Sequence, residues 1–421
     1  MRLHRFFFFL LLFLLPTQLG KHFWPSSSLV FGIRVDYLSP TIYLTDILLF
    51  LVLVLWIIEN LKELKKIKQQ KLRNAFLIFL FSVFLVLNCL FAKNKEAAFY
   101  RLFKVFAFSL FGFYIFKEKI SFKDCSLPIL FSLFYSSLIS IFQFFNQSSL
   151  GGFFYWLGER DFNIQTPGIS LGDFFGKLFL RPYGTFSHPN SMAGFFLVSS
   201  VFVLFTDFGK SFLLKGLKLL TLFSGFLTII FSFSQAAWLV GFLLGVWYFA
   251  VLKIKKLKEN SFFRKIFNFS YFFLILFFGF FAFSVFRFFK DESFVKRVQL
   301  IEVAILMIKN NLIAGVGLNN FVFRLPDFWQ NSSFRLLQPV HNIYLLVFAE
   351  TGLVGLVGFF WFLFLTVRKS LFLPRALFIS LIIILSLGIF DHYWLTLQQN
   401  QLLAVLVFGL IWGGQKDLNF K

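Results

Sequence analysis

The chain has 421 residues, of which 58% are hydrophobic and only 14% are charged, and its mean hydropathy is +0.80. About a quarter of the residues in a soluble domain are charged, so this composition excludes an ordinary soluble globule. The net charge of +22 does not indicate nucleic-acid binding, because the basic residues concentrate in short segments between apolar runs, as they do in membrane proteins.

Apolar runs of about 17–22 residues recur along the chain, and this is the length that an α-helix needs to cross a bilayer. The runs are continuous and do not alternate with polar residues, which excludes a transmembrane β-barrel. The sequence therefore predicts an all-α, polytopic integral membrane protein, with residues 1–421 in a single transmembrane domain. About twelve spans are expected, at about residues 6–15, 42–58, 75–91, 99–116, 127–145, 188–205, 213–231, 236–252, 266–286, 342–367, 376–390 and 397–412.

The charge distribution predicts the orientation of these spans. The first run is short and could be a signal peptide, but it lacks a clear small-x-small cleavage site, which favours a span. Twelve spans place both termini on one side. More than half of the Lys and Arg residues lie at the termini and in short segments on that side, which we therefore expect to be cytoplasmic. Residues 146–187 and 287–341 then form two long extracytoplasmic loops.

The first polar stretch that could carry chemistry reads RPYGTFSHPN and ends the first long loop. Proline after His188 suits the first turn of a helix, so His188 and Asn190 are either binding residues or only a helix start. Arg181 lies at the expected membrane interface, where a guanidinium can bind a phosphate or pyrophosphate through two parallel hydrogen bonds. The alternative for Arg181 is a solvated loop charge.

The second stretch begins at His341, at the outer end of the tenth span. An imidazole titrates near neutral pH, so His341 is a candidate base for a sugar hydroxyl; the alternative is an interfacial anchor. Asn342 and Tyr344 can orient that base or a substrate. Arg297 lies upstream in a segment with the spacing of an amphipathic surface helix.

Other signals for chemistry are weak. Asp391 and His392 at the end of the eleventh span are a possible second acid–base pair, although an interfacial cap is the favoured interpretation. Cys89 and Cys125 have no metal-ligand spacing. The sequence has no DxD motif, Walker loop or His/Cys cluster, so nothing in it requires a metal, a nucleotide or another cofactor.

These stretches also carry a family resemblance. GTFSHPNSMAGFF, the R…E-x-A…MI…N-x-x-x-G-V-G-L-x-N-F block from Arg297 to Phe321, and HNIYLLVFAETGLVGL resemble, in this order, the O-antigen ligase and polymerase family of bacterial envelopes. The resemblance implies a GT-C-like glycosyltransferase in the bacterial cytoplasmic (inner) membrane, with both termini cytoplasmic and no metal or cofactor. Arg297 would contact the pyrophosphate of the donor, and His341 would be the base.

The partners implied are a glycan on undecaprenyl pyrophosphate as donor, the lipid bilayer, and a glycan, lipid A–core or protein as acceptor, without nucleic acid. One departure concerns the turn after the seventh span, where the family usually has Ser-Arg and this chain has Ser234-Gln235. Gln235 can donate hydrogen bonds to the donor but carries no charge. Either Arg181 or another loop cation replaces that arginine, or the donor is held differently, or this member of the family is not a ligase.

The sequence thus predicts a metal-independent transfer of a glycan to an acceptor hydroxyl at the outer membrane face. Within the family, a lipid A–core ligase, a polymerase and a protein glycan ligase all stay open. The alternative from another class is a non-enzymatic glycolipid flippase or exporter. That alternative predicts polar groups deep in several spans, near the bilayer midplane.

Overall fold

The computed structural model describes residues 2–64, 72–174, 176–256, 292–329 and 336–414. These residues form mainly α-helices, as expected from the apolar runs. The helices are α1 (Leu3–Phe13), α2 (Leu44–Leu64), α3 (Leu72–Phe91), α4 (Lys95–Lys117), α5 (Phe122–Asn146), α6 (Pro189–Leu204), α7 (Phe212–Phe231), α8 (Gln235–Lys256), α10 (Glu292–Asn310), α11 (Phe321–Phe328), α12 (Ile343–Ser370), α13 (Arg375–Leu387), α14 (Tyr393–Thr396) and α15 (Gln398–Gly413).

Each predicted span coincides with one of these helices, except the one at 266–286, which lies outside the described residues. By length and composition, α2, α4, α5, α7 and α12 are long and apolar enough to cross a membrane, whereas α1, α6 and α13 are shorter apolar helices. The structure therefore supports a polytopic helical membrane protein, and the number of spans stays a prediction.

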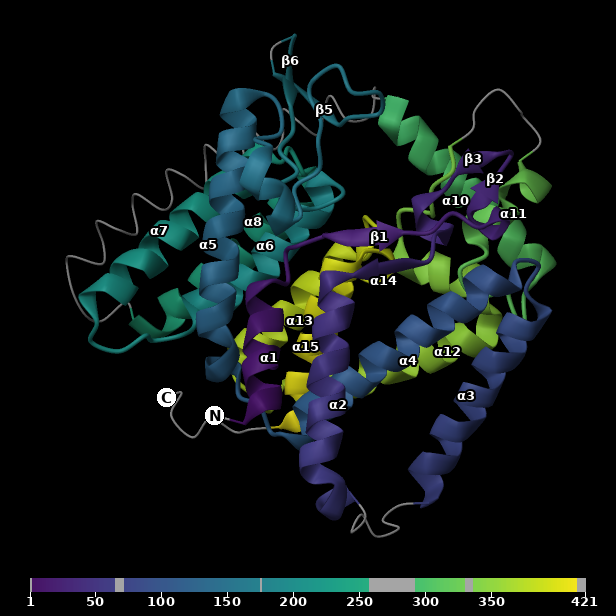
Figure 1. The fold of residues 1–421 in the computed structure, drawn as a ribbon, viewed down its shortest axis with the longest axis horizontal. Helices are drawn as coiled ribbons and strands as arrows, with labels where there is room; N and C mark the ends of the chain where they lie inside the picture. Colours follow the sequence, from purple (N-terminus) through teal and green to yellow (C-terminus); the bar gives the residue numbers. More distant parts are fainter. Residues whose placement is uncertain (1, 65–71, 175, 257–291, 330–335, 415–421) are drawn as a thin grey trace.

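The helices pack side by side around one large apolar core (Figure 1). In this bundle α15 packs along α4, α5 contacts both α6 and α7, and α1 lies between α2 and α5. The beginning of α1 and the end of α15 both lie beside the C-terminal end of α4, since Arg5 pairs with Glu118 and Gly413 lies against Phe116. The two described ends of the chain are therefore at the same end of the bundle.

The connections at the opposite end contain short two-stranded sheets, which the sequence did not predict. In the connection before α2, β1 (Gly20–His22) pairs with β4 (Thr41–Tyr43), and β2 (Leu29–Val30) pairs with β3 (Ile33–Arg34). Between α5 and α6, β5 (Leu171–Phe174) pairs with β6 (Lys177–Leu180). Three 3₁₀ helices complete these connections: η1 (Ser26–Ser28), η2 (Asp36–Leu38) and η3 (Gly152–Leu157).

A second apolar cluster joins the first connection to α10, α11 and the beginning of α12. It contains Val30, Val35 and Leu38 from the connection, together with Leu300, Val303, Ala304 and Met307 of α10. The other face of α10 is exposed at Val298, Ile301 and Ile305, which are also apolar. The buried side positions α10 against α12, and an amphipathic helix on the membrane surface stays a prediction.

α12 is interrupted at Gly352, whose φ of 62° departs from helical geometry. The turn after α10 fills this interruption: Leu353 and Val354 donate to the carbonyls of Leu312 and Ile313, while Val316 and Gly317 donate to those of Ala349 and Glu350. A Cβ on Gly352 would lie 2.3 Å from the oxygen of Ile313, so the close approach requires glycine.

The same turn, residues 315–317, thus uses the N–H groups of Val316 and Gly317 to hold α12. Glu350 is a structural residue of the same joint, because its carboxylate accepts from the Phe321 N–H and interacts electrostatically with Arg101 of α4.

Candidate functional site

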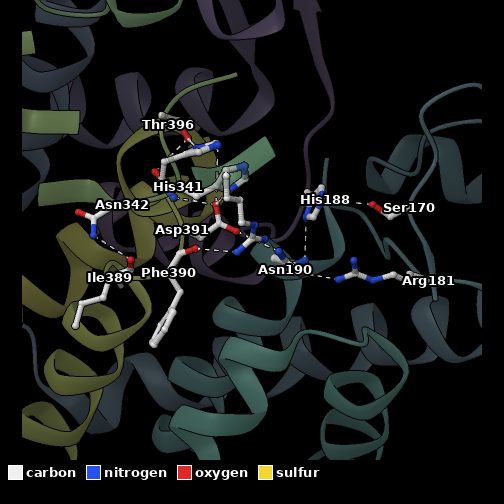
Figure 2. Close-up of polar contacts among 12 residues, drawn as sticks. Ser170, Arg181, His188, Asn190, His341, Asn342, Ile389, Phe390, Asp391 and Thr396 are labelled. Atoms are coloured by element: carbon white, nitrogen blue, oxygen red, sulfur yellow. Dashed lines mark hydrogen bonds and ion pairs between the residues drawn. The ribbon is translucent and has the colours of Figure 1, made fainter. Parts of the chain in front are cut away.

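The site lies where the ends of α6, α12 and α13 meet, and it begins with His341, one residue before the cap of α12. Asn342 caps this helix, since its side-chain oxygen accepts from the N–H groups of Tyr344 and Leu345 at 2.9 Å. The Asn342 amide also donates to the carbonyl of Ile389 at 3.0 Å. These bonds fix the beginning of α12 against the segment that follows α13, and with it the position of His341 (Figure 2).

His341 pairs with Asp391, which lies just beyond α13. Nδ1 of His341 is 3.1 Å from Oδ1 of Asp391, and the same oxygen accepts from the His392 N–H at 2.8 Å. The side chain of Asp391 is only 8% exposed and that of His341 is 16% exposed, so the histidine is the more accessible of the two. The sequence favours an interfacial cap over a second acid–base pair for Asp391 and His392, and the structure places both in contact with His341.

The first polar stretch reaches the same carboxylate from α6. The Asn190 amide donates to Oδ2 of Asp391 at 3.1 Å and accepts from Nη2 of Arg181 at 2.5 Å. Nε of Arg181 donates to the carbonyl of Ser232 at 2.6 Å. Arg181, Asn190, Asp391 and His341 thus form one continuous line of hydrogen bonds, called here the polar chain (Figure 2).

Arg297 approaches from α10, where its Nη1 lies 3.3 Å from the carbonyl of Phe390, the residue before Asp391. Its side chain is half-buried. Two guanidinium groups therefore bracket Asp391 and His341, one from the first long connection and one from the second. The structure brings together the residues that the sequence predicted from two distant stretches.

His188 caps the beginning of α6, which is one of the two roles that the sequence left open for it. Its Nδ1 accepts from the Asn190 N–H at 3.1 Å, and its Nε2 lies 3.3 Å from the hydroxyl of Ser170. Because Nδ1 is an acceptor, the ring is neutral. Burial and, after it, the charge of Arg181 lower the pKa of His188 to about 3.

The surroundings of Asp391 and His392 determine whether each side chain is charged. Burial alone would raise the pKa of the Asp391 carboxyl, but the electrostatic interaction and hydrogen bond with His341 outweigh it and hold that pKa well below its usual range. Asp391 is therefore ionised and can only accept, so it accepts a hydrogen bond from the Nδ1–H of His341. Burial lowers the pKa of His392 to about 3, despite the opposing effect of Asp391.

Among the described residues, His341, Asp391 and His392 also form a group that could hold a metal ion, since their ligand atoms lie within 4.8 Å of one another. Two imidazoles and a carboxylate suit a divalent transition metal. Oδ1 of Asp391, however, already accepts two hydrogen bonds inside this group. A bound ion would compete with the hydrogen bond that orients His341.

Two predicted binding residues have other surroundings. The Tyr344 hydroxyl donates to the carbonyl of Leu385 at 2.9 Å and its ring stacks on Phe360, so it anchors α12 on α13. Gln235 is the first residue of α8, after the predicted tight turn. This turn carries the Ser232 carbonyl that Arg181 holds, so Arg181 lies at the place where the sequence departs from the family pattern. Binding by Tyr344 or Gln235 stays a prediction.

These observations define a polytopic helical membrane protein with a histidine–carboxylate pair and two arginines where three helix ends meet. Residues 220–360, a third of the chain, match the family model described as O-Antigen ligase. The match contains Gln235, Arg297 and His341 and confirms the predicted resemblance to the O-antigen ligase and polymerase family. A comparison with curated proteins gave no match.

Proposed function

We propose that the protein is a metal-independent glycosyltransferase of the O-antigen ligase and polymerase type, which moves a glycan from undecaprenyl pyrophosphate to an acceptor hydroxyl. The observation that carries the proposal is the bond between His341 and the ionised Asp391. This bond places the proton of a neutral His341 on Nδ1 and leaves Nε2 with a lone pair for the acceptor proton.

The reaction is a single displacement at the anomeric carbon of the first sugar. The acceptor oxygen forms a bond to this carbon while the bond from the carbon to the phosphate oxygen breaks, and the bonding electrons leave with the pyrophosphate. Nε2 of His341 takes the hydroxyl proton, and Asp391 stabilises the resulting imidazolium. One displacement inverts the configuration of the anomeric carbon.

Arg181 and Arg297 stabilise the negative charge that builds on the pyrophosphate. Both guanidinium groups are already oriented by carbonyl groups, Arg181 by Ser232 and Arg297 by Phe390. Donors that are fixed before the reaction contribute most, because they need no reorganisation at the transition state. The contact of Arg181 with the turn before α8 supports its role in place of the arginine that the family usually has there.

We infer that this site faces the outside of the bacterial inner membrane, with both termini in the cytoplasm. Among the described residues, basic side chains at the other end of the bundle support this orientation: Arg5 pairs with Glu118 after α4, and Lys369 at the end of α12 bonds to Trp412 of α15. Lipid A–core, a second lipid-linked glycan and a protein are the acceptor classes, and an outward-facing site is open to each of them.

The test is a transfer assay with purified protein, an undecaprenyl-pyrophosphate glycan, a lipid A–core acceptor and EDTA. Glycan joined to lipid A–core indicates a ligase, and a ladder of lengths without that acceptor indicates a polymerase. The His341→Ala variant should be inactive yet inserted and monodisperse. Loss of activity on EDTA treatment would contradict metal independence. Movement of the donor between vesicle leaflets without any transfer would replace the enzyme by the flippase alternative.

A further inference from the structure

The connection before α2, residues 20–43, is a folded part of the site. Its β1–β4 pair is held by Tyr100 of α4, whose hydroxyl donates to the Thr41 carbonyl at 2.9 Å and accepts from the Thr41 N–H at 3.0 Å. Its residues Val30, Val35 and Leu38 are buried with α10 and α12. Figure 1 shows β1 running across the end of the bundle.

Tyr37 joins this connection to the reacting groups. Its ring meets His392 edge-on at 5.3 Å, and the ring of His392 lies 5.0 Å from that of His341. The Tyr37 carbonyl accepts from the Asn319 amide at 3.2 Å, which fixes the backbone at this point. Burial, followed by the charges of Asp391 and Asp36, raises the pKa of Tyr37, so its hydroxyl keeps its proton and can donate.

A group of charged and aromatic side chains continues from Tyr37 along the connection. Asp36 is exposed, and both Asp36 and Arg160 act electrostatically on His22, although burial is the main cause of its lowered pKa. The His22 ring stacks on Trp24 at 5.6 Å with 13° between the planes, and the Arg34 guanidinium lies 5.3 Å from the Trp24 ring centre.

The groups around His341 therefore differ in chemistry. Arg181 and Arg297 approach it next to Asp391, where a pyrophosphate is stabilised. Tyr37, which contacts His392, is preceded by the exposed Asp36 carboxylate, which accepts hydrogen bonds from neutral hydroxyl groups. A carboxylate, a phenol and a half-buried indole are the kinds of group that orient a polar ligand with apolar faces, such as a sugar.

We propose that residues 20–43 form a binding subsite for the donor glycan, in which Asp36 and Tyr37 bind hydroxyl groups of the sugar units beyond the one joined to pyrophosphate. The ring of Trp24, which is held in place by His22 and Arg34, contacts the following sugar unit. This inference rests on the proposed function and adds to it the part of the chain that selects the glycan.

The test compares two donors: undecaprenyl pyrophosphate carrying one sugar, and the same lipid carrying the complete repeat, both prepared from the host cell. The wild type should use the complete repeat with a kcat/KM at least about 10-fold higher. Asp36→Asn and Tyr37→Phe should each reduce this ratio about 5-fold, through KM with kcat nearly unchanged, because they remove contacts made equally in the ground and transition states. Glu96→Gln, an exposed carboxylate at the start of α4, is the matched control and should not change the ratio.

Ratios within twofold of the wild type in both variants would overturn the inference, and so would a wild type that does not distinguish the donors. A second readout is independent of transfer: saturation-transfer NMR of the free repeat oligosaccharide with His341→Ala protein. Binding that Asp36→Asn abolishes, together with a wild type that transfers no glycan, would retain the subsite and reject the proposed function. Binding that is absent, or unchanged by Asp36→Asn, would reject the subsite.

Discussion

Replacing Asp391 by Asn tests how the polar chain works, because it removes one charge and changes the volume little. In the wild type the carboxylate accepts from His341 at 3.1 Å, from the His392 N–H at 2.8 Å and from Asn190 at 3.1 Å. An amide has one oxygen and one NH₂ group, so it cannot accept all three bonds. If its NH₂ faces His341, the neutral imidazole must carry its proton on Nε2, where the acceptor proton should be taken.

The expected loss follows from these contacts. General-base catalysis contributes about 10²–10⁴-fold, and a histidine with its proton on the wrong nitrogen loses most of it. We therefore expect kcat for glycan transfer to fall about 10³-fold in Asp391→Asn, with the KM for the donor within about threefold. Since both groups act as a unit, Asp391→Asn combined with His341→Ala should be no slower than His341→Ala alone.

The assay is single-turnover transfer in nanodiscs from a fluorescent lipid-linked glycan, with Glu96→Gln as the control for an exposed carboxylate. Circular dichroism and thermal unfolding establish that the variant is folded. A kcat within twofold of the wild type would refute the assignment of Asp391. Additive losses in the double variant would show that His341 and Asp391 act independently.

Three further predictions follow from the same geometry. Arg297→Ala should reduce kcat about 10²–10³-fold and Arg297→Lys should reduce it less, because lysine keeps the charge but not the planar donors; equal rates in transfer assays of the two variants would contradict this. Micromolar Zn²⁺ should inhibit transfer by binding His341, Asp391 and His392, with EDTA restoring the activity; stimulation by Zn²⁺ would instead indicate a metal-dependent enzyme. The free energy of unfolding should fall from pH 7 to pH 5, because the unfolded state protonates His392 near pH 6.5 whereas the folded state binds that proton only near pH 3. In His392→Gln this fall, measured by thermal unfolding, should be smaller by about 2 kcal/mol. The same pH dependence in the variant and the wild type would contradict the prediction.

Much of the helical fold could be predicted from the sequence because apolar runs report directly on burial in a membrane. The predicted span at 213–231 corresponds to α7 (Phe212–Phe231), and the turn before α8 lies where it was expected. Polar loops carry no such signal. In the connection at 20–43, the two- and three-residue strands depend on contacts with α4, α10 and α12, which lie far away in the sequence.

The site was predicted in part. His341, Arg181 and Arg297 each lie beside an apolar run, so the sequence alone indicates them as candidate site residues. Asp391 is 50 residues from His341, and an acidic residue at a helix end is usually a cap, so its role depended on the meeting of α12 and α13. The interruption of α12 could not be predicted from the sequence either, because Gly352 lies in a continuous apolar run.

The break at Gly352 gives the two parts of α12 a common support. The first part begins next to His341, and its Ala349 and Glu350 carbonyls accept from the turn after α10. The second part, up to Ser370, is apolar and begins with Leu353 and Val354, which donate to the same turn. Both parts are therefore joined to the helix of Arg297, so a shift of α10 would be transmitted to His341 and to the second part of α12 together.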